Sequence, residues 1–404
     1  MKKIAVLIGI VLTFVHCTND TPLPNGYELL DRENKVGLAA PLTFKPTKTA
    51  HYWKIIPAGA KSSLMLGVGK DMQSFVIFQC RNLIKVPVQD DVLAAKLSMY
   101  SVGTVGDKNP FTLSAHRYDQ YWSENNILWK DVENSYQPEP LETWQFTPQD
   151  TTWHSFQFTN LQFIKEWIAD SHQEEQSITG LLLKFDQASS GAIFVSSESS
   201  ITPPYIEVIS QDTSGVIDTT IAYLSHDASL LQNKTGIDED VVEQEPAVLK
   251  VGNGTGYRGL LHFDVSEIPA DATIHQALLT FYIAHSEVFM PADSASSTFS
   301  VAARLIESDS TWSIDSTYSA AIDVANSSKN TFAFDSTTPV KTMSYMVQRW
   351  VSNVSPNYGI MVYAKDQSSD FYEMAFKSGA MDSVVAPTLV ITYSLPAAHR
   401  FARP

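Results

Sequence analysis

Short runs of alternating apolar and polar residues recur along most of the chain, separated by turn-forming residues. Clear examples are Lys96–Tyr100 and Ser155–Phe158. A period of two is typical of a half-buried β-strand, because successive side chains of a strand point to opposite faces of its sheet. Many short strands with few helical patterns predict antiparallel β-sandwiches. The fold class we expect is therefore all-β.

Two segments depart from this alternation and carry apolar residues at helical spacing. Each set forms one stripe on a helix of two to three turns, the first being Leu161, Ile164, Trp167 and Ile168, and the second Met343, Met346, Val347, Trp350 and Val351. Polar residues before them, Thr159 or Asn160 and then Thr342, are expected to be the N-caps. We expect each helix to close one open end of a sandwich.

The pattern is also repeated along the chain. Residues 66–209 and 250–393 carry the same order of strands, turns and helix, and Trp122-Ser123 in the first copy answers Trp312-Ser313 in the second. An internal repeat of this length predicts two tandem domains of one architecture, jelly-roll-like β-sandwiches each with a short capping helix. A polar stretch at Gln211–Gly215 marks the expected junction. The predicted domains are residues 41–211 and 215–395, followed by a tail at 396–404.

The first residues have the features of an export signal. A basic pair is followed by an apolar run of about a dozen residues, too short for an ordinary membrane-spanning helix, and the run ends at Cys17. This order resembles a bacterial lipoprotein signal at residues 1–16, although that family has a small residue where this chain has His16. The resemblance implies lipidation of Cys17, with residues 17–40 as a tether. A plain secretory signal and an uncleaved anchor are the alternatives.

Composition limits the classes of partner. The chain of 404 residues is 44% hydrophobic and 18% charged, as in folded globular proteins. Its formal net charge of −16 argues against nucleic acid, which requires a basic surface. The second of its two cysteines, Cys80, lies in an apolar run and is expected to be a small buried side chain.

No motif in the sequence predicts an enzyme. The chain has no nucleophile elbow, zinc-protease motif, phosphate-binding loop or paired cysteines at zinc spacing. His116 and Tyr118 are residue types that some β-sandwich polysaccharide lyases use as acid and base, and on a strand they would share one face, opposite Arg117. Ordinary strand surface is the simpler interpretation, so we expect no catalytic residues.

The second repeat resembles a known family. It contains a glycine-rich segment with a following strand, a helical Gln-Arg-Trp-Val, a Gly-Ile-Met-Val strand and a closing Ala-Pro strand, located at Val251–Pro269, Gln348–Val351, Asn357–Val362 and Ala386–Tyr393. In the order of these motifs and in their residues, the second repeat resembles DNRLRE-type domains. These are β-sandwich modules of bacterial and archaeal surface and secreted proteins, related to a carbohydrate-binding module family. The match covers most of residues 217–394 and is looser in the first repeat.

The resemblance implies carbohydrate binding, and aromatic side chains are the residues that sugar rings stack on. Tyr136, Trp144 and Trp153 lie in an insertion of the first repeat that has no clear counterpart in the second. They are the predicted ligand-binding residues, although loop aromatics also commonly pack under their own loop. Arg258, which has no counterpart in the first repeat, is the fourth predicted ligand-binding residue.

Structural calcium is the other ligand that we consider. Acidic loops at Asp238 and Asp240 and at Asp366 and Asp370 offer the oxygen ligands that Ca²⁺ prefers, although no spacing matches a defined calcium loop. Solvated loops are the alternative interpretation.

Together these patterns predict an exported lipoprotein, anchored in the bacterial envelope at the outer membrane or cell surface. Its role would be non-catalytic, namely binding a polysaccharide or acting as an adhesin-like module. A structural or protein-binding element of a surface assembly is the first alternative, and a polysaccharide-degrading enzyme is the second.

Overall fold

The structure is a computed structural model. It describes residues 38–59, 61–69, 72–173, 178–234, 236, 241–252, 256–289, 299–308, 312, 318–319, 322–334, 341–365, 372–379 and 383–396. The predicted signal, Cys17, nearly all of the tether and the tail beyond 396 lie outside these residues. Within the described part of the chain, none of the helices has the length and apolar character needed to span a bilayer.

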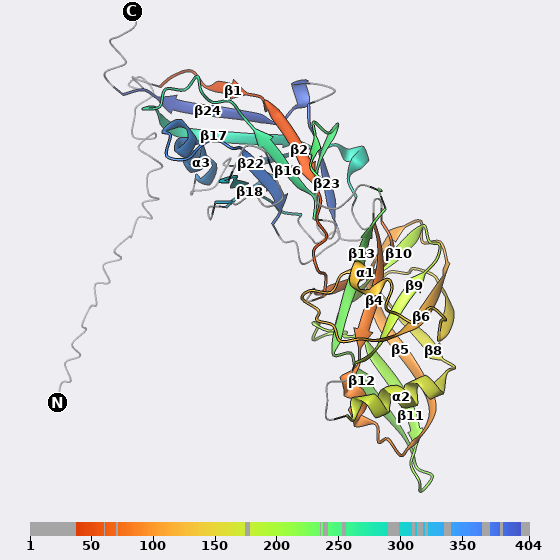
Figure 1. The fold of residues 1–404 in the computed structure, drawn as a ribbon. Coiled ribbons are helices and arrows are strands. Elements are labelled where there is room, and N and C mark those ends of the chain that lie inside the picture. Colours follow the sequence, from red (N-terminus) through yellow and green to blue (C-terminus); the bar gives the residue numbers. More distant parts are fainter. Residues whose placement is uncertain are drawn as a thin grey trace, which may run out of the picture.

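The fold is all-β, as the alternation predicts, and its antiparallel sheets form two lobes (Figure 1). One eleven-stranded sheet makes the first lobe. Its main path runs β12-β11-β5-β10-β3-β4-β9-β6-β7, with β13 paired to β4 and β8 paired to β5. The bounds of these strands are β3 (Ser63–Val68), β4 (Met72–Gln79), β5 (Asp91–Gly106), β6 (Phe111–Asp119), β7 (Glu142–Phe146), β8 (Thr152–Phe158), β9 (Thr179–Phe185), β10 (Ser190–Val195), β11 (Tyr205–Gln211), β12 (Ile217–Tyr223) and β13 (His226–Asn233).

Three sheets make the second lobe, in the orders β1-β24-β17-β21-β20, β14-β2-β16-β22-β18-β19 and β15-β23. A buried core lies between them. The bounds are β1 (Leu42–Phe44), β2 (Lys48–Tyr52), β14 (Glu243–Gln244), β15 (Val248–Gly252), β16 (Arg258–His262), β17 (Thr273–Tyr282), β18 (Val301–Leu305), β19 (Asp323–Val324), β20 (Asn326–Ser327), β21 (Thr331–Phe334), β22 (Ile360–Ala364), β23 (Glu373–Lys377) and β24 (Thr388–Ser394).

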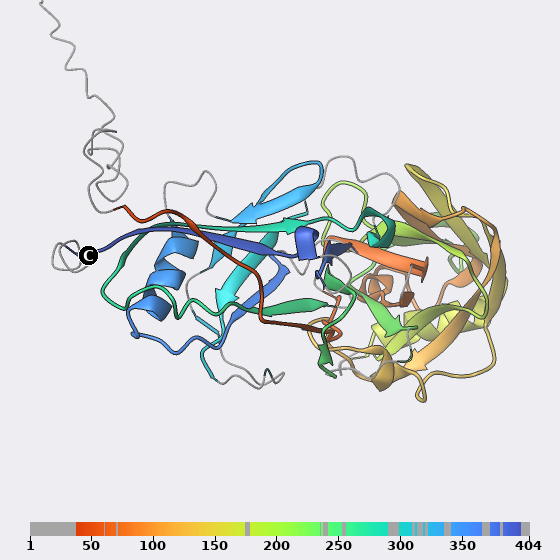
Figure 2. The same ribbon diagram turned by 90° about the horizontal axis from the view of Figure 1, so that it is seen from above.

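Each lobe contains strands that lie outside its own sequence repeat, and we call these the exchanged strands. Strands β1 and β2 precede the first repeat but pair with β24 and β16 of the second lobe. Strands β12 and β13 follow the predicted junction but pair with β11 and β4 of the first lobe. In Figures 1 and 2, the red and orange β1 and β2 accordingly lie among green and blue strands. The predicted boundaries at 41–211 and 215–395 divide the chain by repeat, whereas the sheets divide it near residues 53 and 234.

A tight turn explains why β12 stays with the first lobe. The stretch expected to be a domain junction joins β11 to β12 as a hairpin. The Asp212 carboxylate accepts hydrogen bonds from the N–H groups of Ser214 and Val216, at 2.8 and 2.9 Å. Gly215 has a φ of 88°, a conformation that glycine adopts readily. Such a short connection makes β12 the antiparallel neighbour of β11, and β13 follows it.

Both predicted helices are present, as α2 (Leu161–Ser171) and α3 (Thr342–Val351), together with a short α1 (Trp129–Val132). Single 3₁₀ turns occupy Arg81–Lys85, His285–Glu287 and Ser383–Val385. Asn160 caps α2 by accepting a hydrogen bond from Phe163 N at 3.1 Å. The predicted cap at Thr342 is wrong, since this residue lies inside α3.

The capping helices contribute large side chains to the two cores. Trp167 of α2 is fully buried among the strands of the first lobe, and Trp350 of α3 has the same role in the second lobe. Cys80 is buried in the first core, as its apolar surroundings predict. The tryptophans of the helices are therefore core residues, which leaves the outer faces of the sheets for binding.

Candidate functional site

A row of aromatic side chains crosses the outer face of the first lobe. It consists of Tyr100 on β5, Trp153 on β8, Tyr205 on β11 and Tyr223 on β12. Ring centroids are 5.4 Å apart from Tyr100 to Trp153, 5.4 Å from Trp153 to Tyr205 and 6.1 Å from Tyr205 to Tyr223. The four residues, called the aromatic row below, come from four different strands of one sheet.

Strand alternation places the row on the solvent side. On β5 the neighbours of Tyr100 in sequence include Met99, which is buried in the core, and on β11 the residue after Tyr205 is the buried Ile206. Trp153 is 43% exposed and Tyr223 is 46% exposed. Adjacent rings meet edge to face, with interplanar angles of 61° to 75°. The row is therefore fixed by mutual packing while its two largest exposed surfaces remain open to a ligand.

Small and polar residues surround the row. Ser98 and Ser155 form a cross-strand pair in the gap between Trp153 and Tyr205, with their hydroxyl oxygens 3.3 Å apart. Their small size lets the two larger rings meet across β5. On the same face, Lys96 and Glu207 form an ion pair at 2.9 Å and are partly exposed. Hydrogen-bonding groups thus lie beside an apolar stacking surface, a combination that is common in ligand-binding sites.

Only one of the three predicted loop aromatics faces a ligand-accessible surface in this way. Tyr136 packs against Trp129 and its hydroxyl accepts a hydrogen bond from Lys184 Nζ at 2.7 Å. Trp144 packs against the Phe156 ring, and its indole N–H donates to a backbone carbonyl. Both side chains are partly buried against the first core. Trp153 is the predicted residue that belongs to the aromatic row.

Arg258, the fourth predicted residue, lies in the other lobe. It is half-buried on β16, where its Nη1 donates a hydrogen bond to the Tyr52 hydroxyl at 3.1 Å. The Tyr52 hydroxyl lies 3.2 Å from that of Tyr318, and burial together with this hydrogen bond raises the pKa of Tyr318. Arg258 therefore supports a polar cluster in the second lobe, and the structure does not bring it together with Trp153.

The residues considered as acid and base have structural partners. His116 is buried, with Nδ1 2.9 Å from the Gln137 carbonyl oxygen and Nε2 2.9 Å from the Ser114 hydroxyl. Burial is the largest effect on its pKa and lowers it. Arg117 points to the opposite face and forms ion pairs with carboxylates. These contacts give His116 and Arg117 structural roles on β6.

The four aspartates predicted for calcium, Asp238, Asp240, Asp366 and Asp370, lie outside the described residues. The carboxylates that the described residues bring together are a different set. Glu124, Glu198 and Asp227 place side-chain oxygens within 4.8 Å of one another. Of these three acids, only Glu124 has a recognisable place in the sequence pattern, since it follows Trp122-Ser123 in the repeat.

Comparison of the chain with protein-family models, with curated protein sequences and with solved structures found no match in any of the three.

Proposed function

We propose that the chain is a non-catalytic glycan-binding protein and that the aromatic row of the first lobe holds the glycan. The observation that carries the proposal is the row itself, four rings across four strands with Trp153 and Tyr223 open to solvent. The apolar C–H faces of sugars stack on such rings, and the neighbouring Lys96 and Glu207 offer hydrogen bonds to hydroxyl groups.

The shape of the surface favours an extended polysaccharide over a single sugar. The row draws on four strands, β8, β5, β11 and β12, and the rings that contact each other have centroids 5.4 to 6.1 Å apart. A chain of sugars can contact several rings at once, whereas a monosaccharide covers one. In the second repeat, Tyr282 stands at the position that matches Tyr100, but Thr388 stands in place of Tyr205, so the row is not repeated in full. We therefore assign glycan binding to the first lobe.

The proposed location is the bacterial envelope, with the chain exported and held by lipid on Cys17. The basic and apolar start that ends at this cysteine supports the proposal, as does the likeness of the second repeat to DNRLRE-type surface modules. A protein in this position meets polysaccharides of its own cell wall, of its neighbours or of its surroundings. The composition of the aromatic row does not distinguish these sources, so the glycan is defined by the experiment.

A polysaccharide and glycan-array screen of residues 18–404 tests the proposal, with Trp153→Ala as the main variant. We expect binding to at least one polysaccharide, and a loss of about tenfold or more in affinity in the variant, which corresponds to about 1.4 kcal/mol. Tyr121→Ala is the matched control, because Tyr121 is 66% exposed and lies outside the row. Equal loss in both variants, or binding unchanged by Trp153→Ala, contradicts the assignment.

One observation favours a second function, that of a structural or protein-binding element in a surface assembly. Strand β12 lies at the end of the eleven-stranded sheet and exposes the apolar side chains Ile217 and Ile221. An exposed edge strand with apolar residues can pair with a strand of another protein. An empty array together with concentration-dependent self-association, lost in Ile221→Lys, would favour this function over glycan binding.

A further inference from the structure

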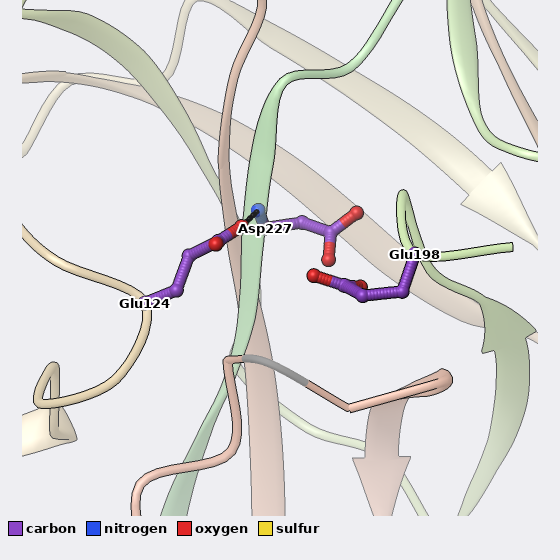
Figure 3. Close-up of side chains that lie close together, drawn as sticks. All are labelled: Glu124, Glu198 and Asp227. Carbon is purple, nitrogen blue, oxygen red and sulfur yellow. Dashed lines mark hydrogen bonds between the residues drawn. The ribbon is translucent and has the colours of Figure 1, made fainter.

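Three acidic side chains converge in the first lobe (Figure 3). Glu124 lies in the connection between β6 and α1, Glu198 lies in the connection that follows β10, and Asp227 is the second residue of β13. Figure 3 shows the Asp227 and Glu198 carboxylates facing each other. The convergence joins three segments that are far apart in sequence, one of them an exchanged strand.

Asp227 is the unusual member of the group, because its side chain is fully buried, at 0% exposure. One carboxylate oxygen, Oδ2, accepts a hydrogen bond from Ser197 N at 2.8 Å. The other, Oδ1, is buried and has no hydrogen-bond partner. Buried polar atoms are nearly always paired, so an unpaired oxygen on a carboxylate that faces the carboxylate of Glu198 indicates a missing partner of positive charge.

The acids of the group also affect one another electrostatically. Burial is the largest effect on Asp227 and raises its pKa well above the ordinary value, and the charges of Glu198 and Glu124 raise it further. Burial also raises the pKa of Glu124, while the Arg81 guanidinium lowers it by a smaller amount. A fold that gathers three acids and desolvates one of them has its charge repulsion relieved either by protonation of the buried acid or by a bound cation.

We propose that Glu124, Glu198 and Asp227 bind a hard divalent cation and that Ca²⁺ is the ion that fits best. All the side-chain ligands are carboxylate oxygens, which Ca²⁺ prefers, whereas Zn²⁺ favours nitrogen and sulfur. Calcium–oxygen distances are about 2.3–2.6 Å, so two ligands of one ion can be up to about 5 Å apart. The side-chain oxygens of the three acids lie within 4.8 Å of one another, which meets this condition. The exposed Glu198 leaves one side open to water ligands.

The position of the site gives the cation a structural role. Asp227 lies on β13, which comes from beyond the sequence junction, whereas Glu124 and Glu198 belong to the first repeat. The backbone N–H of Asp227 also donates to the Glu124 carboxylate at 2.8 Å. An ion bound by all three would fasten the exchanged strand to the loops at this end of the lobe. This role is independent of glycan binding, so either proposal can fail without the other.

The test is thermal unfolding of residues 18–404 in EDTA, in CaCl₂ and in MgCl₂, with calcium binding measured by titration calorimetry. We expect millimolar Ca²⁺ to raise the Tm by several degrees, because a ligand that binds only the folded state stabilises it. In Asp227→Asn the Ca²⁺ shift should disappear, while the Tm in EDTA should be higher than that of the wild type. The neutral amide keeps the shape and the Ser197 contact but removes the buried charge.

Asp107→Asn, which removes an exposed acid in the β5–β6 turn, is the matched control and should keep the full Ca²⁺ shift. A Mg²⁺ shift that also disappears in Asp227→Asn supports a site for hard cations in general. A Ca²⁺ shift of equal size in wild type and Asp227→Asn overturns the proposal, since the ion then binds elsewhere. Absence of any shift in the wild type with either metal also overturns it.

Discussion

The strand exchange predicts how the chain can be divided into folded parts. A fragment of residues 54–234 retains β12 and β13 and keeps every strand of the eleven-stranded sheet. A fragment of residues 41–211, cut at the boundary of the sequence repeat, lacks these two strands and carries β1 and β2 instead. We expect the first fragment to be a folded monomer and the second to be unfolded or aggregated.

The size of the expected loss of stability follows from the buried side chains that the cut after residue 211 removes. Leu224 and Leu230 are buried in the first core, at 4% and 0% exposure, together with two alanines of the same strands. Burial of one leucine contributes about 1.5–3 kcal/mol, so the two together account for roughly 3–6 kcal/mol. Domain stabilities are about 5–15 kcal/mol in total. In addition, β4 loses a partner strand along eight register positions, from His226↔Gln79 to Asn233↔Met72.

The assay is urea unfolding followed by tryptophan fluorescence, combined with size-exclusion chromatography of both fragments. Residues 54–234 should elute as a monomer and unfold in one cooperative transition. Residues 41–211 should show no such transition, or elute as aggregates through the unpaired edge of β4. A monomeric 41–211 with stability equal to that of 54–234 would refute the reasoning, because β1 and β2 would then replace the exchanged strands.

Two further predictions concern the acidic group. Because the folded-state pKa of Asp227 is raised above its unfolded value of 3.8 by burial, Glu198 and Glu124, the metal-free protein should lose stability as pH rises from about 4 through that folded pKa. Urea unfolding in EDTA at a series of pH values checks this, and a slope that persists unchanged in Asp227→Asn would show that other groups cause it. In Gly59→Ala, the new Cβ would lie 2.1 Å from the Glu124 carbonyl oxygen, so we expect a loss of about 1–3 kcal/mol and a smaller Ca²⁺-induced rise in Tm. Gly103→Ala, whose Cβ has no neighbour closer than 3.8 Å, should leave both measurements nearly unchanged, and an equal response of the two variants would count against the steric argument.

The elements of the fold were predictable from local pattern. Period-two alternation marks strands such as β5 and β8, and the apolar stripes mark α2 and α3, because each signal depends on residues close in sequence. The N-terminal cap of α3 was not predictable, because it depends on a residue that is distant in sequence. The N–H of Met343 has no local capping acceptor and instead donates a hydrogen bond at 3.1 Å to the carboxylate of Asp323, which lies twenty positions earlier in the chain. Tertiary contacts of this kind leave no trace in a short window.

The strand exchange was not predictable from the repeat. Strands β12 and β13 carry the same alternation as strands that stay within their repeat, so the pattern does not tell which sheet edge they join. The deciding feature is local, the tight turn around Asp212 and Gly215 that makes β11 and β12 a hairpin. The same polar, turn-forming residues are equally typical of a domain junction, because turns within a domain and between domains share composition.

The candidate sites were only partly predictable for a related reason. Composition identified Trp153, but its partners Tyr100, Tyr205 and Tyr223 belong to strands that alternation describes as ordinary half-buried sheet. Sequence alone does not show that four such residues align on one face. Asp227 is a single acid inside an apolar strand, and only the fold brings it to Glu124 and Glu198. Both groups are products of strand pairing.

Both proposed sites include a residue from an exchanged strand, Tyr223 in the aromatic row and Asp227 in the acidic group. The exchange also determines the order of the lobes from the N-terminus. Leu38 forms a bridge to Ser394, and β1 pairs with β24, so the chain enters the second lobe first (Figure 1). Along the chain, the second lobe is therefore entered before the first lobe, which carries the exposed aromatic row, and it is completed only after the first lobe has formed from the intervening residues.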